Sequence, residues 1–198
     1  MEHDAWLIDL DGTLYYPLPL KLAMAAEVVL LGTRAIGTLR RFRHEHEELR
    51  ALPEQGEVPY RTQLERTAVA LGGTADQVEA VVAEWMQARP CPWIRRFRRK
   101  NLLAEIEHFR NAGGKTAIVS DYPARRKLDA LGAAALFDAI VANGEPGGPR
   151  RLKPSPEGYL LAAERLGVRP EKCLVIGDRD DADGLAARAA HMAFRRIG

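Results

Sequence analysis

The sequence contains little cysteine and no long uninterrupted run of apolar residues. Its 198 residues include two cysteines, Cys91 and Cys173, which lie far apart in the chain. This pair forms neither a disulfide framework nor a metal-binding spacing, so we expect a cytoplasmic protein from a reducing compartment. The most apolar window, residues 18–31, contains Lys21 and Glu27 and is too short to span a bilayer. Because the amino terminus is acidic and lacks the basic start of a signal peptide, we expect no membrane partner.

The sequence also lacks an excess of one charge sign. It has 29 lysines and arginines against 27 aspartates and glutamates, which gives a formal net charge of +2. Such a balance gives no indication of a nucleic-acid partner. The densest basic segment, residues 95–100, is short and leads into an amphipathic helix. We therefore favour a solvated face, or a positive potential near an anionic substrate, over nucleic-acid or membrane binding.

Apolar strands and amphipathic helices alternate through most of the chain. Short apolar runs predict strands at residues 5–10, 115–120, 137–142, 173–177 and 192–197. Helical periodicity predicts helices at residues 102–111, 123–131, 156–166 and 185–190. Continuous apolar strands that alternate with amphipathic helices are typical of a parallel sheet covered on both faces. We therefore expect an α/β fold with a doubly wound, Rossmann-like parallel sheet.

Residues 18–92 follow a different, all-helical pattern between the first and second strands. Helices are predicted from Leu22 to about residue 50, over residues 59–71, and from an N-cap at Thr74 to about residue 88. Gly32 and Gly37 weaken the first of these helices, unless small residues are needed there for close packing. Two proline-broken stretches, residues 15–20 and 89–93, are predicted as connectors. We expect residues 1–17 and 93–198 to form the core and residues 18–92 an inserted helical domain.

The first strand ends in two aspartates, Asp9 and Asp11, followed by Gly12 and Thr13. Like charges at that distance repel each other, so a cation or a shared proton must compensate them. Taken alone, the pattern could be a strand end followed by an ordinary Asp-Gly turn. In a doubly wound sheet, however, ligands bind beyond the carboxyl ends of the strands. The residues at the other strand ends therefore decide between the two interpretations.

Each later strand is followed by a polar residue suited to one task. The second strand ends in Ser120, followed by Asp121, and Lys153 follows the third strand. The fourth leads into an acid-rich turn that contains Asp178, Asp181 and Asp183. Carboxylates are hard oxygen ligands that suit Mg²⁺, while a lysine and a hydroxyl suit phosphoryl oxygens.

Each of these residues also has a structural explanation of its own. Ser120 could cap a helix, Lys153 could be an ordinary surface lysine, and the acids could satisfy a helix dipole. The coincidence of four such elements, each at a strand end, favours a phosphate and metal site.

In these motifs the sequence resembles the haloacid dehalogenase superfamily along its whole length. The segment Asp9-Leu10-Asp11-Gly12-Thr13 resembles the first motif of that superfamily, Ser120 the second, Lys153 the third, and the run from Gly177-Asp178 to Asp183 the fourth. The helical insertion resembles the cap of the phosphoglycolate phosphatase-like branch. One departure is Ala190-His191-Met192, where relatives often have Ala-Gly and where the sheet edge could therefore be short.

The resemblance implies a role for each matching residue. Asp9 is the nucleophile, and Asp11 protonates the leaving group and later activates water. Mg²⁺ is held by Asp9, the backbone carbonyl of Asp11 and Asp178, while Asp183 orients the metal shell. The phosphoryl group is held by Lys153, which also offsets the charge of Asp9, and by three further residues: Ser120, Thr13 and, as a site-lining residue, Asp121. Asp181 is the alternative to Asp183 as the residue that orients the metal shell.

The expected function is that of a Mg²⁺-dependent phosphatase, a phosphoric monoester hydrolase, acting on a small phosphorylated metabolite. Dehalogenases need no acid for a halide and typically lack the second aspartate, so Asp11 favours phosphoryl transfer. Two alternatives stay open: a phosphosugar mutase, and a non-catalytic phosphate-binding or interaction module. The protein is expected to be a monomer or a homodimer. Candidate specificity positions, each also explicable as structural, are the loop of residues 54–60, Arg61, Trp85 and Arg89.

Overall fold

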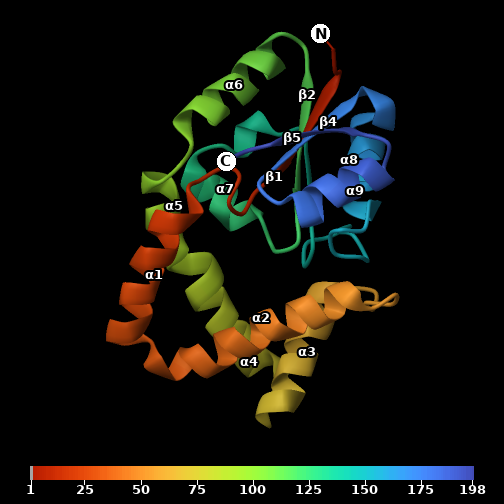
Figure 1. Ribbon diagram of the computed structural model, residues 1–198. Coiled ribbons are helices and arrows are strands. Elements are labelled where there is room, and N and C mark those ends of the chain that lie inside the picture. Colours follow the sequence, from red (N-terminus) through yellow and green to blue (C-terminus); the bar gives the residue numbers. More distant parts are fainter. Residues whose placement is uncertain (1) are drawn as a thin grey trace.

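In the computed structural model, which describes residues 2–198, five strands form one parallel sheet (Figure 1). The strand order is β3-β2-β1-β4-β5. The strands are β1 (Ala5–Asp9), β2 (Lys115–Ser120), β3 (Ala139–Ala142), β4 (Cys173–Gly177) and β5 (Ala193–Arg196). The expected doubly wound α/β fold is thereby confirmed. Because β1 lies at the centre, between β2 and β4, Asp9 lies at the point where the strand order reverses, which is where such sheets bind ligands.

Helices cover both faces of the sheet. One face is covered by α5 (Pro90–Arg96), α6 (Lys100–Asn111) and α7 (Arg125–Leu131), and the other by α8 (Glu157–Leu166) and α9 (Leu185–Ala189) (Figure 1). Successive side chains of β1 point to opposite faces, so Ile8 packs with the first group and Leu7 with the second. Both side chains are fully buried. Each contributes roughly 1.5–3 kcal/mol to stability by burial.

Four longer helices lie between β1 and α5: α1 (Pro17–Leu31), α2 (Ile36–Ala51), α3 (Pro59–Leu71) and α4 (Ala75–Val82). The last three pack around Phe42, Leu64 and Val82, beyond the carboxyl edge of the sheet (Figure 1). Thr74 caps α4 in a reciprocal capping box with Gln77, as expected from the sequence. Shorter helical turns complete the chain: η1 (Thr33–Ala35), η2 (Ala83–Ala88), η3 (Ala134–Leu136), η4 (Pro170–Lys172) and η5 (Asp180–Gly184).

The two proline-rich stretches are helical from their first proline onward, so their prediction as connectors is wrong. Helix α1 begins at Pro17 and includes Pro19, and α5 begins at Pro90 and includes Pro92. All four prolines lie in a first helical turn. The backbone N–H groups of that turn have no partner within the helix, so proline removes no hydrogen bond there.

The single long helix predicted from Leu22 to about residue 50 is also wrong, because the chain bends by 110° after Leu31. The ring of Trp85 packs against Gly32, where an added Cβ would lie 2.1 Å from a ring carbon. Close packing is therefore the reason for the glycine at this position. Gly37 has no such neighbour.

Helix α1 presents an apolar face to solvent. Its exposed large side chains are Leu18, Leu22, Val29, Leu30 and Leu31, each at least 65% exposed. None of the helices in residues 2–198 is by itself long and apolar enough to cross a membrane. Helix α1 and the segment Thr33–Ala51 pass that test only as a bent pair. The expectation of a monomer or a homodimer stays a prediction.

His191 has a backbone φ of 58°, in the left-handed region that glycine adopts without strain. The glycine that the resemblance led us to expect here would adopt this conformation freely. The strand that follows, β5, is nevertheless formed and pairs with β4 from Ala193 to Arg196. The substitution therefore leaves the sheet edge in place.

Glu45 of α2 is a buried carboxylate that two arginines hold. Its side chain is 2% exposed, with Arg66 Nε 2.6 Å from Oε2 and Arg41 on Oε1. Burial alone would raise the pKa of Glu45, but hydrogen bonds and charges from Arg66 and Arg41 outweigh it and lower the pKa. Since the folded-state pKa is lowered, the pair stabilises the fold above the ordinary glutamate pKa and loses this contribution as the pH falls through the folded value.

We expect Glu45→Gln to lower the free energy of unfolding by about 1–2 kcal/mol near neutral pH, because both arginines are partly exposed. In urea unfolding, the difference from wild type should shrink as the pH falls below the ordinary glutamate pKa. Glu48→Gln, an exposed position on the same helix, is the control and should change stability little at any pH. A pH-independent difference at residue 45 would contradict the assignment.

Candidate active site

Asp9 is the last residue of β1, and its carboxylate is held from both sides. Its side chain is 8% exposed. One oxygen accepts a hydrogen bond from Lys153 Nζ, and the other accepts one from Thr13 Oγ1 at 2.8 Å. Thr13 lies in the turn that leaves the strand, so the turn fixes the orientation of the aspartate that precedes it. Asp9, Thr13 and Lys153, which the sequence analysis assigned to one site, are therefore in contact.

Asp9, Asp178 and Asp183 form a cluster in which one carboxylate oxygen from each residue lies within 4.8 Å of the other two. Two glycines permit this approach. A Cβ on Gly12, which has a φ of 99°, would lie 2.3 Å from Asp178 Oδ2, and a Cβ on Gly177 would lie 2.4 Å from Asp183 Oδ2. The glycines of the first and fourth motifs thus make room for the acids of the cluster.

The cluster carries more negative charge than its surroundings compensate. Burial, with a smaller contribution from Asp183 and against the opposing charge of Lys153, raises the pKa of Asp9 to about 8. Burial and Asp183 also raise the pKa of Asp178. Three carboxylates this close together are a suitable ligand set for a hard divalent cation, which would relieve their mutual repulsion. The donor set therefore fits a divalent metal ion.

Lys153 is the central cation of this site. Its ammonium group contacts Asp9, Asp183 Oδ1 at 2.8 Å and the carbonyl of Val119 at 3.3 Å. Burial opposes its charge, but Asp183 and Asp9 outweigh burial and raise the pKa of Lys153 well above the ordinary value. Lys153 is therefore charged, and it offsets part of the negative charge of the cluster.

The structure distinguishes between the two acids of the fourth motif that the sequence left open. Asp183 is buried and accepts hydrogen bonds from Lys153, from Tyr159 Oη at 2.8 Å and from the backbone N–H of Arg179 at 3.2 Å. Asp181 is 69% exposed and pairs with Arg179. Asp183 thus lies in the carboxylate cluster and Asp181 lies outside it.

The side chain of Asp11 is not part of the carboxylate cluster and has partners of its own. Its two oxygens lie 2.6 and 2.7 Å from Lys127 Nζ, and Oδ1 also accepts a hydrogen bond from Tyr15. The sequence analysis missed both partners. Lys127 has the spacing of an ordinary helix residue, and Tyr15 lies in a stretch that we predicted as a connector.

Ser120 and Asp121 lie at the end of β2 but engage different partners. The Oγ of Ser120, a buried residue, accepts a hydrogen bond from the backbone N–H of Tyr122 at 3.2 Å. Asp121 Oδ1 accepts one from the backbone N–H of Lys153 at 3.1 Å, and its Oδ2 lies 3.8 Å from His46 Nε2. Asp121 therefore joins the loop of Lys153 to helix α2.

Helix α2 and the loop after it contact the loop of Lys153 at the carboxyl edge of the sheet. Arg50 Nε donates to the carbonyl of Lys153 at 2.6 Å, and the backbone N–H of Leu152 donates to Gln55 Oε1 at 2.7 Å. Of the predicted specificity positions, the loop of residues 54–60 thus reaches the site. Arg61, Trp85 and Arg89 instead contact other residues of the helical region.

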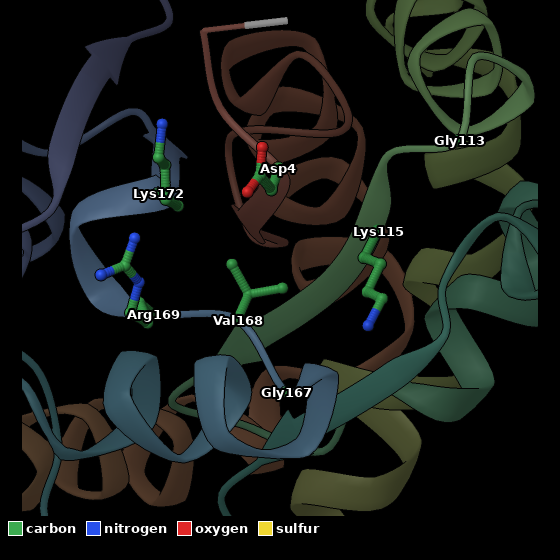
Figure 2. A pocket seen from close by; sticks show the side chains of 7 residues that line it. All are labelled: Asp4, Gly113, Lys115, Gly167, Val168, Arg169 and Lys172. Carbon is green, nitrogen blue, oxygen red and sulfur yellow. The ribbon is translucent and has the colours of Figure 1, made fainter.

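A separate hollow of about 370 Å³ lies at the opposite, amino-terminal edge of the sheet (Figure 2). It is lined by Asp4, Gly113, Lys115, Gly167, Val168, Arg169 and Lys172. Lys115 Nζ donates to the carbonyl of Leu166 at 2.6 Å. None of the predicted site residues lines this hollow.

The fold and the site together define a doubly wound α/β protein with an aspartate–lysine site at the switch point of its sheet. A family model described as haloacid dehalogenase-like hydrolase matches residues 3–191. The chain belongs to this family of hydrolases. The expected family and the expectation of an enzyme are therefore confirmed.

Individual relatives agree with this assignment. The chain is 30% identical to hexitol phosphatase A of Escherichia coli (strain K12), over 90% of this chain and 76% of that protein. It is 32% identical to phosphoglycolate phosphatase of Xylella fastidiosa (strain 9a5c), over 94% of this chain and 76% of that protein. The structure of L-2-haloacid dehalogenase from Xanthobacter autotrophicus matches with a TM-score of 0.67 at 23% identity, covering 98% of this chain and 77% of that one. This last likeness concerns the fold.

Proposed function

We propose that this enzyme is a Mg²⁺-dependent phosphatase that hydrolyses a small phosphorylated metabolite through an aspartyl-phosphate. One observation carries the proposal: Asp9 lies at the switch point of the sheet, paired with a buried lysine and close to two further carboxylates. The names of the two similar proteins, hexitol phosphatase A and phosphoglycolate phosphatase, support a phosphoric monoester as substrate.

In this proposal Asp9 attacks the phosphorus atom as the phosphorus–oxygen bond to the leaving group breaks. Asp11 gives its proton to the departing oxygen, and the resulting carboxylate then takes a proton from the water that hydrolyses the aspartyl-phosphate. Inorganic phosphate leaves and Asp9 is regenerated. Thr13 and Lys153 each hold one oxygen of Asp9, which supports a fixed direction of attack.

Asp9, Asp178 and the backbone carbonyl of Asp11 would hold Mg²⁺ in this scheme, and Asp183 would orient the shell around it. When bound, the ion neutralises the negative charge shared between carboxylate and phosphate. Ser120 and Lys153 would hold the transferred phosphoryl group. The carboxylate of Asp121 contacts the backbone N–H of Lys153 and the ring of His46. We therefore assign Asp121 the role of positioning the loop that carries Lys153.

Residues 18–92 would act as a cap that closes the site against water. The contact of Arg50 with the backbone of Lys153 supports this role, because it couples α2 to the phosphate-binding loop. The loop of residues 54–60 is the best-placed specificity segment, since Gln55 holds the residue before Lys153.

Metal dependence gives the direct test. Purified protein with Mg²⁺ is expected to release phosphate from p-nitrophenyl phosphate, to stop when EDTA is added and to recover with excess Mg²⁺. We expect Asp178→Asn to need roughly 10- to 100-fold more Mg²⁺ for half-maximal rate, since it removes a charged ligand. Thermal unfolding gives an independent readout, because Mg²⁺ should raise the melting temperature of wild type more than that of the variant.

Asp181→Asn is the matched control for that experiment. It removes an acid from the same turn, but one that pairs with Arg179 outside the cluster, so its Mg²⁺ requirement should equal that of wild type. If both variants needed the same increase in Mg²⁺ concentration, the metal ion would have to bind elsewhere. A phosphosugar as substrate separates the alternatives: a mutase would return the phosphoryl group to the sugar, a phosphatase would release phosphate, and a binding module would do neither.

A further inference from the structure

We infer that Lys127, on helix α7, is the residue that positions the Asp11 side chain. With Asp11 held in this way, the site suits substrates that are phosphate esters of alcohols. This inference rests on the proposed function and names the class of leaving group. Alcohol oxygens are poor leaving groups that need a proton, so the direction of the acid matters most for them. The residue is not among those that the superfamily resemblance assigns.

Lys127 contacts both carboxylate oxygens of Asp11, and we call this bidentate contact the clamp. Lys127 Nζ lies 2.6 Å from Asp11 Oδ1 and 2.7 Å from Oδ2, so it holds both oxygens and limits rotation of the carboxylate. Tyr15 adds a second donor to Oδ1. Oδ2 accepts from Lys127 in this arrangement and retains a lone-pair site for the proton that passes to the leaving group.

Burial and the anchoring of helix α7 hold the Lys127 side chain in place. The Lys127 side chain is 7% exposed, whereas Asp11 is 29% exposed and therefore open to an incoming ligand. Helix α7 is held at its start by Glu145, whose Oε1 accepts hydrogen bonds from the backbone N–H groups of Ala124 at 2.7 Å and Arg125 at 2.8 Å. Lysine has a long flexible side chain, so burial and a bidentate partner are both needed to give it one position.

The proton balance explains why the clamp serves the first chemical step. As the phosphorus–oxygen bond breaks, the electron pair goes to the leaving oxygen, and the proton of Asp11 follows it. Asp11 becomes a carboxylate beside the ammonium group of Lys127. The pair then holds this carboxylate in place until it accepts a proton from the attacking water. A leaving group that is stable as an anion does not need the proton.

A series of ring-substituted aryl phosphates tests the inference, because the basicity of the leaving group changes along the series while the phosphoryl group stays the same. For Lys127→Met we expect kcat/KM to fall roughly 30-fold or more with phenyl phosphate but less than about 3-fold with 2,4-dinitrophenyl phosphate, since general acid catalysis is worth roughly 10²–10⁴-fold. The value of KM should change little, because the phosphoryl group is bound by other residues.

A double variant shows whether Lys127 acts through Asp11. With phenyl phosphate, Lys127→Met combined with Asp11→Asn should be no slower than Asp11→Asn alone, because residues that act as a unit are not additive. Equal losses on both esters, or an additive double variant, would overturn the inference. Absence of turnover by wild type on every ester would instead overturn the proposed function, and this inference with it.

Two further variants keep the test valid if Lys127→Met folds poorly. Tyr15→Phe removes one donor to Asp11 and should show the same dependence on leaving group in weaker form. Lys127→Arg keeps the charge and should recover part of the loss on phenyl phosphate. Arg126→Met is the matched control, because it removes a positive charge from an exposed neighbouring position of α7. It should change kcat/KM little with either ester.

Discussion

Asp9→Asn is expected to lower kcat/KM for phosphate esters by roughly 10⁴-fold or more while the protein stays folded. An amide oxygen has neither the charge nor the basicity needed to attack phosphorus, whereas its shape matches that of the carboxylate. Lys153 can still donate to the amide oxygen at residue 9, and the Thr13 hydroxyl can accept from the amide NH2 group, so the local structure should persist. Release of p-nitrophenol in the presence of Mg²⁺ measures the rate, and circular dichroism checks the fold.

The stability of the same variant should depend on pH in a definite direction. Burial, opposed in part by Lys153, raises the pKa of Asp9 to about 8, above its ordinary value. A raised folded-state pKa means that the native protein binds the extra proton, so wild type loses stability as the pH rises towards the folded value. In metal-free buffer, Asp9→Asn should therefore gain stability relative to wild type as the pH rises from about 4 to about 8.

Asp4→Asn is the control for both measurements, because Asp4 is an exposed residue at the opposite end of the same strand. It should keep wild-type activity and should not show the relative gain in stability at high pH. Turnover by Asp9→Asn close to that of wild type would exclude Asp9 as the nucleophile and would leave the carboxylate cluster as a binding site only.

The part of the site that could be predicted from the sequence is the part that lies on strand ends. Asp9, Ser120 and Asp178 follow short apolar runs, and parallel pairing brings all such ends to one edge of the sheet. Lys153 could be predicted because it follows the third strand and resembles the third motif of the superfamily. The helix boundaries near Gly32 could not, since the break depends on a contact with Trp85, which is distant in sequence.

Two further residues of the site, Lys127 and Tyr159, could not be predicted either, for a physical reason. Lys127 and Tyr159 lie on helices, where periodicity indicates only which face is buried. A buried lysine or tyrosine has the same periodicity as a packing residue, and its charged or polar partner comes from another element. The structure supplies those partners: Asp11 for Lys127 and Asp183 for Tyr159.

Lys153→Met is the second substitution for which we expect a large effect, and it should affect both activity and stability. The ammonium group of Lys153 is the contact that Asp9 and Asp183 share, and its side chain is 6% exposed. Removing it leaves buried carboxylates without their cation, which typically costs about 3–5 kcal/mol. We also expect kcat/KM to fall roughly 10³-fold, because a preorganised positive charge at the transferred phosphoryl group is lost.

The two effects of Lys153→Met should respond differently to Mg²⁺. A bound divalent cation relieves repulsion among Asp9, Asp178 and Asp183, so added Mg²⁺ should restore part of the lost stability in thermal unfolding. It should not restore the rate, because the phosphoryl group would still lack its lysine contact. Lys172→Met removes a charge from the far edge of the sheet and should leave both quantities at wild-type values. Activity of Lys153→Met within about tenfold of wild type would show that the lysine supports the fold but not the chemistry.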